Sequence, residues 1–196
     1  MQNLRSKIPQ RTCTREYTDY TSYKSYLKSD FDSRCGYCDD HDQYYGGSDS
    51  YHIDHFAPKK FADLISKYSN LVYSCPFCNK AKRNKWPSDD QNVNVVGDEG
   101  FIDPCSENYD IHLNRDENGS IISVTPIGGY MHKHLELNLN RHAIIWKLDR
   151  INEAITKIQV LRDSDSELGE DLSNRLNQLL ADYREYDQRL KDTYNK

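Results

Sequence analysis

Four of the six cysteines form two pairs whose spacing suits a metal ion. Each pair has the form Cys-x-x-Cys, and 36 residues separate the pairs. Two such pairs in a chain with reduced thiols indicate a tetrahedral zinc site, whose four sulfur ligands would leave no position for a substrate. We therefore expect a structural zinc ion; the alternative is that the thiols are small buried side chains without an ion. The expected ligands are Cys35, Cys38, Cys75 and Cys78.

Residues suited to phosphodiester hydrolysis lie between and just after these pairs. Hydrolysis needs a base for the attacking water and a cation for the charge that develops on the phosphate. His55 has an ordinary pKa of about 6.5 and can act as an uncharged base at neutral pH. Asp54 offers a carboxylate oxygen and Asn79 a carbonyl oxygen, which both suit Mg²⁺ or Mn²⁺. His52, two residues before Asp54, is the alternative ligand or base, although we expect it to have a supporting role.

The order of these residues resembles the HNH endonuclease family, the ββα-metal nucleases, in the branch whose fold is held by four zinc-binding cysteines. The resemblance covers about residues 33–85. Its motifs, in order, are Asp54-His55, Pro58, Asn70-Leu71, and the second cysteine pair followed by Asn79 and Lys82.

The resemblance implies a hydrolase that cleaves DNA and leaves 3′-hydroxyl and 5′-phosphate ends. It implies that Asp54 and Asn79 hold the catalytic metal and that His55 is the general base. Asn70 matches the middle asparagine of the motif, whose family role is to hold the loop and to orient the histidine. The position of Asn79 is often histidine in the family, and this substitution mainly affects which metal is held.

Basic residues around the predicted site favour contacts with a phosphate backbone. Residues 1–85 contain 14 Lys and Arg against 10 Asp and Glu, a balance of +4, whereas residues 86–196 contain 12 against 21, a balance of −9. The net charge of −5 therefore does not exclude a nucleic-acid partner. The alternative is that the basic residues of the predicted helix after the second cysteine pair form an ordinary basic surface. The expected DNA-binding residues are Lys59, Lys60, Lys82, Arg83 and Lys85.

Short elements must position these side chains. Residues 51–56 and 71–74 favour strands, and 77–85 favour a helix with a proline just before it. Neighbouring residues of a strand point to opposite faces, so Asp54 and His55 would approach a phosphate from different sides.

The chain of 196 residues suits one compact catalytic unit with an appendage. The predicted class is α+β: a zinc-stapled ββα-metal core at 33–86, after a lead-in at 1–32. An irregular β-containing extension follows at 87–130. From 131 to 196 apolar residues recur at helical spacing, which predicts a helical hairpin with a turn at 163–169 and a possible role in partner docking.

A small HNH core joined to a long helical segment is similar to the PtuB nuclease subunits of Septu-type bacterial anti-phage systems. That resemblance implies an ATPase partner subunit docked on the hairpin. No run of eighteen apolar residues is present and Met1 to Arg11 lacks the apolar core of a secretion signal, so we expect a cytoplasmic protein without a membrane partner.

Two other functions are compatible with the sequence. One is a non-catalytic zinc-binding module that recognises nucleic acid or protein. The other is an RNA-cleaving HNH nuclease, because a hydrolytic site of this kind neither needs nor forbids a 2′-hydroxyl group.

Overall fold

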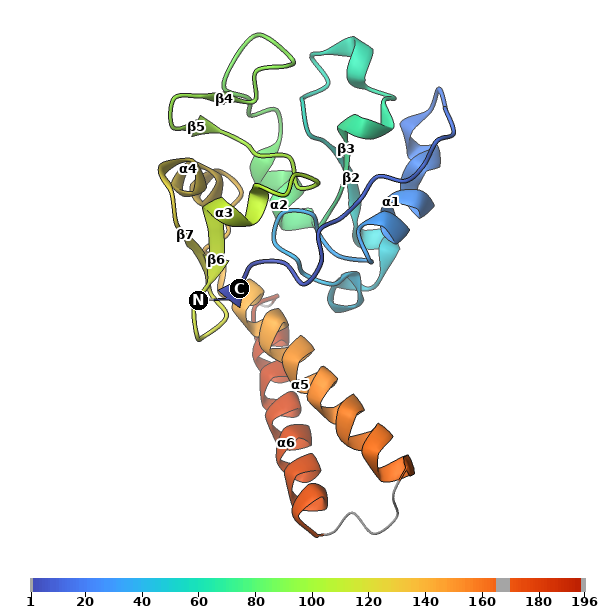
Figure 1. Cartoon of the computed structure of the whole chain (residues 1–196), viewed down its shortest axis with the longest axis vertical. Coiled ribbons are helices and arrows are strands. Elements are labelled where there is room, and N and C mark those ends of the chain that lie inside the picture. The colour runs from blue at the N-terminus through green and yellow to red at the C-terminus, as the bar shows by residue number, and fades with distance from the viewer. Residues whose placement is uncertain (1, 165–169, 195–196) are drawn as a thin grey trace. The chain divides into compact units, whose positions relative to one another are not determined.

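The computed structural model describes residues 2–164 and 170–194, which fall into two compact units, Met1–Leu139 and Asn140–Lys196 (Figure 1). Each unit has a hydrophobic cluster of its own. Short strands and helices are mixed in the first unit, which confirms the predicted α+β class. Within the described ranges, no helix has the length and the apolar character needed to cross a membrane.

The first unit contains seven short strands and four α-helices within its described residues, along with several 3₁₀ turns. In chain order the elements are β1 (Gln2–Asn3), η1 (Tyr20–Tyr23), α1 (Lys24–Asp30), η2 (Asp42–Tyr45), η3 (Ser48–Ser50), β2 (His52–His55), η4 (Ala62–Leu64), η5 (Tyr68–Asn70), β3 (Leu71–Ser74), α2 (Pro76–Lys82), β4 (Val95–Val96), β5 (Glu99–Gly100), α3 (Tyr109–His112), β6 (Leu113–Arg115), β7 (Ile121–Ser123) and α4 (Pro126–His134).

Strands β2 and β3 and helix α2 form the predicted ββα element. The strands pair antiparallel, with His52 opposite Ser74 and His55 opposite Leu71. All four residues of β3 are buried, whereas β2 runs from an exposed His52 to a buried His55. The strand pair therefore brings the buried end of β2 beside the start of β3 and leaves the start of β2 exposed.

Backbone geometry explains where helix α2 begins and where it ends. Cys75 is its N-cap and Pro76 occupies the first turn, where the missing N–H costs no hydrogen bond. The helix ends at Lys82, three residues before the predicted end. Arg83 there has a φ of +48°, which a helix cannot continue.

The extension after α2 is tied to the N-terminus. A three-stranded sheet has the order β1-β6-β7, so the first residues of the chain pair with β6. Arg115 at the end of β6 is buried, and its guanidinium donates to the carbonyl oxygens of Cys38 (2.7 Å), Gly119 (2.7 Å) and Leu4 (3.2 Å). One side chain thus joins the N-terminal segment, the first cysteine pair and the extension.

Helix α4 lies very close to the backbone beside β6. Its N-cap is Thr125, whose hydroxyl accepts a hydrogen bond from the Gly128 N–H. A Cβ atom added at Gly128 would lie 2.0 Å from the carbonyl oxygen of His112, so only glycine permits this contact.

Tyrosine–aspartate pairs are a repeated feature of the first unit, which helps to explain a chain with 15 tyrosines. A phenol can fill apolar space while its hydroxyl satisfies a carboxylate that has little access to water. The pairs, with O···O distances, are Tyr37–Asp54 (2.6 Å), Tyr45–Asp40 (2.6 Å), Tyr68–Asp30 (2.6 Å) and Tyr73–Asp42 (2.8 Å).

The second unit consists of α5 (Asn140–Ser164) and α6 (Glu170–Asp192), which run side by side (Figure 1). Their shared cluster contains Ile155, Ile158, Leu176 and Leu179. The expectation of helix from residue 131 onward is wrong in one respect. The chain turns at 135–139 between α4 and α5, where Glu136 has a φ of +54°. Of the predicted turn at 163–169, residues 165–169 lie outside the described residues.

Candidate functional site

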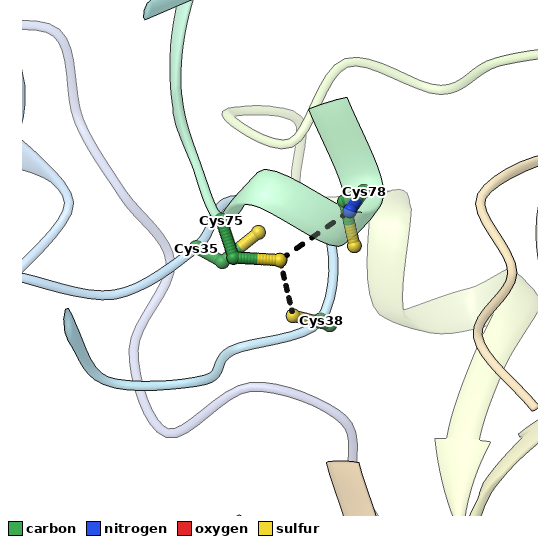
Figure 2. Close-up of side chains that lie close together, drawn as sticks. All are labelled: Cys35, Cys38, Cys75 and Cys78. Carbon is green, nitrogen blue, oxygen red and sulfur yellow. Dashed lines mark hydrogen bonds between the residues drawn. The ribbon is translucent and has the colours of Figure 1, made fainter. Parts of the chain in front are cut away.

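The four paired cysteines come together in the first unit and are all buried. Their sulfur atoms lie within 4.8 Å of one another, and Figure 2 shows them converging from two segments of the chain. Sγ of Cys38 and Sγ of Cys75 are 3.8 Å apart. Four sulfurs bound to zinc at about 2.3 Å in a tetrahedron are about 3.8 Å from each other. The cluster therefore has the size of a four-sulfur zinc site.

Hydrogen-bonded backbone turns orient the two cysteines of each pair toward the other pair. In the first pair, the Cys35 N–H donates to the Asp40 carbonyl, and Cys35 accepts from Asp39, which has a φ of +66°. In the second pair, the Cys78 N–H donates to Sγ of Cys75 at 3.4 Å. This N–H···S bond stabilises a thiolate at the start of α2, where the helix dipole also favours negative charge.

The thiol electrostatics also fit a cation. Burial raises the pKa of Cys38, Cys75 and Cys78 above the usual thiol value. Burial opposes the ionisation of Cys35 as well, but hydrogen bonds from the other three thiols outweigh it and lower its pKa. Burial therefore opposes ionisation of the four thiols when no cation is bound. A zinc ion held by the cluster would supply the charge that allows all four to ionise.

A cavity of about 680 Å³ lies beside β2 and α2. Its wall includes Asp54 and His55 from β2 and Asn79 from α2. Asp54 and His55 are neighbours on a strand and turn to different surroundings, as their alternation predicts, yet both reach this one cavity. Exposed His52 borders the same cavity.

Asp54 is held by two donors that act on one of its oxygens. Oδ2 accepts a hydrogen bond from the Tyr37 hydroxyl at 2.6 Å and lies 3.3 Å from the Lys82 ammonium. Burial raises the pKa of Asp54, while Lys82 and Tyr37 act in the opposite direction. Oδ1 accepts no hydrogen bond from any residue that the structure describes, and Asp54 borders the cavity.

His55 is fixed in one tautomer. Its Nε2 lies 2.9 Å from the Ile65 carbonyl oxygen. A carbonyl only accepts, so Nε2 carries the proton and Nδ1 of the neutral ring is an acceptor. Burial lowers the pKa of His55 and the nearby Lys59 lowers it further, against the effect of the Ile65 hydrogen bond. The ring is therefore neutral and basic at Nδ1 near pH 7.

Asn70 holds the loop that follows β2. Its Oδ1 accepts from the Ala57 N–H at 2.8 Å, and its Nδ2 donates to the carbonyls of Ala57 (3.0 Å) and Leu64 (3.2 Å). The Leu64 contact lies directly before Ile65, the acceptor of His55. Asn70 does not line the cavity. Its position is that of a support for the loop that orients His55.

Of the five predicted DNA-binding residues, two border the cavity, two are exposed but bond elsewhere, and one is buried. Lys59 and Arg83 border the cavity, together with Lys80. Lys60 and Lys85 are exposed but bond elsewhere: Lys60 contacts Asp89 at 3.1 Å, and Lys85 donates to the His134 carbonyl at 3.3 Å.

Lys82 is the predicted DNA-binding residue that the structure directs inward. Its side chain is 0% exposed, and its ammonium donates to the His55 carbonyl at 2.9 Å besides pairing with Asp54. The rings of Phe56 and Phe101 lie 6.0 and 5.6 Å from the ammonium. In this position Lys82 cannot reach a phosphate in solvent.

Sequence reasoning missed two tyrosines at the site. Tyr37 lies inside the first cysteine pair, and Tyr20 lies before residue 33, where the resemblance begins. Tyr20 borders the cavity, and its ring centroid is 4.8 Å from that of His55. Neither position carries a sequence signal, because tyrosine is common throughout this chain.

Comparisons with known proteins agree with this geometry. The family model for HNH endonucleases matches residues 35–85. Septu protein PtuB from Bacillus mycoides (strain KBAB4) is 27% identical to the chain over 122 residues, which cover 51% of this chain and 40% of that protein. The match thus spans less than half the length of this relative. No solved structure matches the chain. Residues 35–85 therefore match the HNH endonuclease family, within a chain that is similar to Septu protein PtuB.

Proposed function

We propose that the protein is a metal-dependent endonuclease that hydrolyses phosphodiester bonds in DNA. His55 is the general base, Asp54 and Asn79 hold Mg²⁺ or Mn²⁺, and the four-cysteine cluster is a structural zinc site. The observation that carries the proposal is the tautomer of His55. Its hydrogen bond to Ile65 leaves Nδ1 as the acceptor, and the ring borders the same cavity as Asp54 and Asn79.

Each residue has a distinct task in this proposal. Nδ1 of His55 takes the proton from the attacking water, and Nε2 keeps its own proton because the Ile65 carbonyl holds it. Lys59 and Arg83 at the cavity wall bind phosphate oxygens. A Mg²⁺ or Mn²⁺ ion on Oδ1 of Asp54 and the Asn79 carbonyl would supply positive charge to the leaving oxygen.

Nicking of supercoiled plasmid DNA tests the assignment. The wild-type protein is expected to nick when Mg²⁺ or Mn²⁺ is added. His55→Ala and Asp54→Ala should abolish nicking while about one zinc per chain is retained. His134→Ala is the matched control, because His134 lies on α4 outside the cavity, and it should nick normally.

Three results would refute parts of this assignment. Nicking that persists in both His55→Ala and Asp54→Ala contradicts the catalytic roles. Nicking that is lost in His52→Ala and kept in His55→Ala transfers the role of base to His52. Cleavage of an RNA of the same sequence without cleavage of DNA would mean that RNA, and not DNA, is the substrate.

We further propose that the protein is the nuclease subunit of a bacterial anti-phage defence system and works in the cytoplasm with an ATPase subunit. The similarity to Septu protein PtuB supports the defence role. Reduced thiols in the cytoplasm leave the four cysteines free for zinc. The second unit offers exposed apolar side chains for docking, with exposed fractions of 62% for Val160, 49% for Leu161 and 40% for Leu180.

Co-purification with a co-expressed ATPase subunit tests the docking role. Deletion of residues 163–196 is expected to abolish co-purification and to leave the zinc content unchanged. Normal co-purification of the deleted chain would refute docking through the hairpin.

A further inference from the structure

We propose that Tyr20 is a further residue of the nuclease site. Its ring positions His55, and its hydroxyl, together with the Lys59 ammonium, binds the two non-bridging oxygens of a phosphate in the nucleic-acid backbone. The inference rests on the proposed function. Tyr20 lies outside residues 35–85, so the match to the family model assigns it no role.

The ring of Tyr20 restricts the ring of His55. The two centroids are 4.8 Å apart and the ring planes meet at 73°, which is an edge-to-face contact. The hydrogen bond from Nε2 to Ile65 fixes one nitrogen of His55 but still permits the ring to tilt about that bond. The tyrosine ring limits this tilt from the cavity side, so the direction of the Nδ1 lone pair is defined by two contacts.

The hydroxyl of Tyr20 and the ammonium of Lys59 form a pair at the cavity wall. Nζ of Lys59 lies 3.0 Å from the Tyr20 hydroxyl and 4.5 Å from the ring centroid. The ammonium donates to the hydroxyl oxygen, so the hydroxyl hydrogen points away from Lys59. Among the described residues, this hydroxyl donates no hydrogen bond. Lys59 is exposed and keeps two further N–H donors.

This pair has the chemistry of a phosphate clamp. One cation and one neutral O–H donor, both bordering the cavity, match the two non-bridging oxygens of a phosphodiester. These donors contact the phosphate backbone and not the bases, so the clamp would bind nucleic acid of any sequence. The clamp also lies beside the general base, and a phosphate held there is presented to water activated by His55.

The segment that carries Tyr20 is anchored to the loop that carries Ile65. The hydroxyl of Ser66 donates to the Thr18 carbonyl at 2.5 Å. The ring of Tyr23 lies 4.9 Å from that of Tyr68. Since Ser66 directly follows Ile65, Tyr20 and the acceptor of His55 are held by the same piece of backbone. Tyr20 is thus a fixed part of the site.

Two substitutions separate the tasks of ring and hydroxyl. Single-turnover and steady-state cleavage of a fluorescent DNA duplex are measured with Mn²⁺. Tyr20→Phe keeps the ring, so kcat should stay within about twofold while KM rises about tenfold from the lost hydrogen bond to a charged group. Tyr20→Leu removes the ring, and kcat should fall at least tenfold because His55 loses its alignment. Tyr26→Phe is the control on α1, outside the cavity, and should match wild type.

Binding of the same duplex without added divalent ions gives a second readout that does not need cleavage. The dissociation constant should rise about tenfold in Tyr20→Phe and stay unchanged in Tyr26→Phe. Lys59→Met should weaken binding and reduce the slope of log affinity against log salt by about one.

The outcomes distinguish this inference from the proposed function. Cleavage by wild type with normal kcat, KM and affinity in both Tyr20 variants overturns the inference and leaves the endonuclease assignment standing. A wild-type protein that does not cleave, with affinity that still falls in Tyr20→Phe, refutes the endonuclease and supports the phosphate contact. If Tyr20→Leu unfolds at a lower temperature than wild type, the test rests on Tyr20→Phe alone. Unchanged KM and unchanged affinity in that variant would refute the phosphate clamp.

Discussion

Replacing Lys82 by methionine is expected to destabilise the Met1–Leu139 unit, and to do so through Asp54. Methionine has a similar shape and fills the same space, so the change removes mainly the charge. The Lys82 side chain is 0% exposed and that of Asp54 is 7% exposed, so little water reaches this ion pair to replace the lost cation. Asp54 would keep the Tyr37 hydroxyl as its donor.

The geometry sets the size of the effect. At 3.3 Å, two unit charges attract by ~5 kcal/mol at an effective dielectric constant of about 20. Breaking a buried ion pair by removing one partner typically costs about 3–5 kcal/mol, because the other charge stays buried. For a unit of this size, the melting midpoint should fall by about 10 °C or more.

A double-mutant cycle measured by thermal unfolding, without added divalent ions, tests the reasoning. Asp54→Asn removes the stranded charge, so the Lys82→Met/Asp54→Asn protein should melt well above Lys82→Met alone. Lys80→Met is the matched control, because Lys80 is an exposed lysine on the same helix, and its midpoint should not change. A midpoint in the double variant equal to or below that of Lys82→Met would refute the electrostatic account and leave only lost packing.

Four further expectations address other parts of the molecule. Removing metal with a strong chelator should unfold the Met1–Leu139 unit, and circular dichroism should recover with Zn²⁺ but not with Mg²⁺. Asn70→Ala should lower the free energy of unfolding by about 3 kcal/mol, because the N–H and the carbonyl of Ala57 both lose their hydrogen bonds to the Asn70 side chain. A loss below 1 kcal/mol in denaturant titration contradicts this expectation. Burial raises the pKa of Cys105 to about 11, so its alkylation at pH 8, followed by peptide mass, should be slow and should increase about tenfold per pH unit up to that value. Leu179→Ala should destabilise α5–α6 by about 2–4 kcal/mol in helical signal against denaturant, and an unchanged midpoint would exclude a packed hairpin core.

The local part of the site could be predicted from sequence. Strand, turn and helix at 51–82 follow from alternation, from the prolines and from the cysteine turns, which all act over a few residues. The spacing of the cysteine pairs predicted the cluster, because two Cys-x-x-Cys turns present four sulfurs in only a few ways.

The missing part depends on contacts between residues far apart in sequence. Lys82 reads as a surface cation on a short helix, but Phe56 and Phe101 cover it, and no local pattern shows that a ring 19 residues later lies above that face. The break between α4 and α5 has a similar cause. Leu135 continues the helical spacing of α5, yet it is buried in the core of the first unit, as is Leu137, and this burial outweighs continuation of the helix.

The buried guanidinium of Arg115 has a consequence for how this chain can be divided. It satisfies the carbonyl of Cys38 inside the matched HNH segment and that of Leu4 far outside it. The Tyr109 hydroxyl likewise donates to the Tyr37 carbonyl at 2.8 Å. A fragment cut at residues 35–85 would leave the carbonyls of Cys38 and Tyr37 without these partners, which hold the first cysteine turn. Segments before and after the family motif are therefore expected to be needed, together with it, for the first unit to fold.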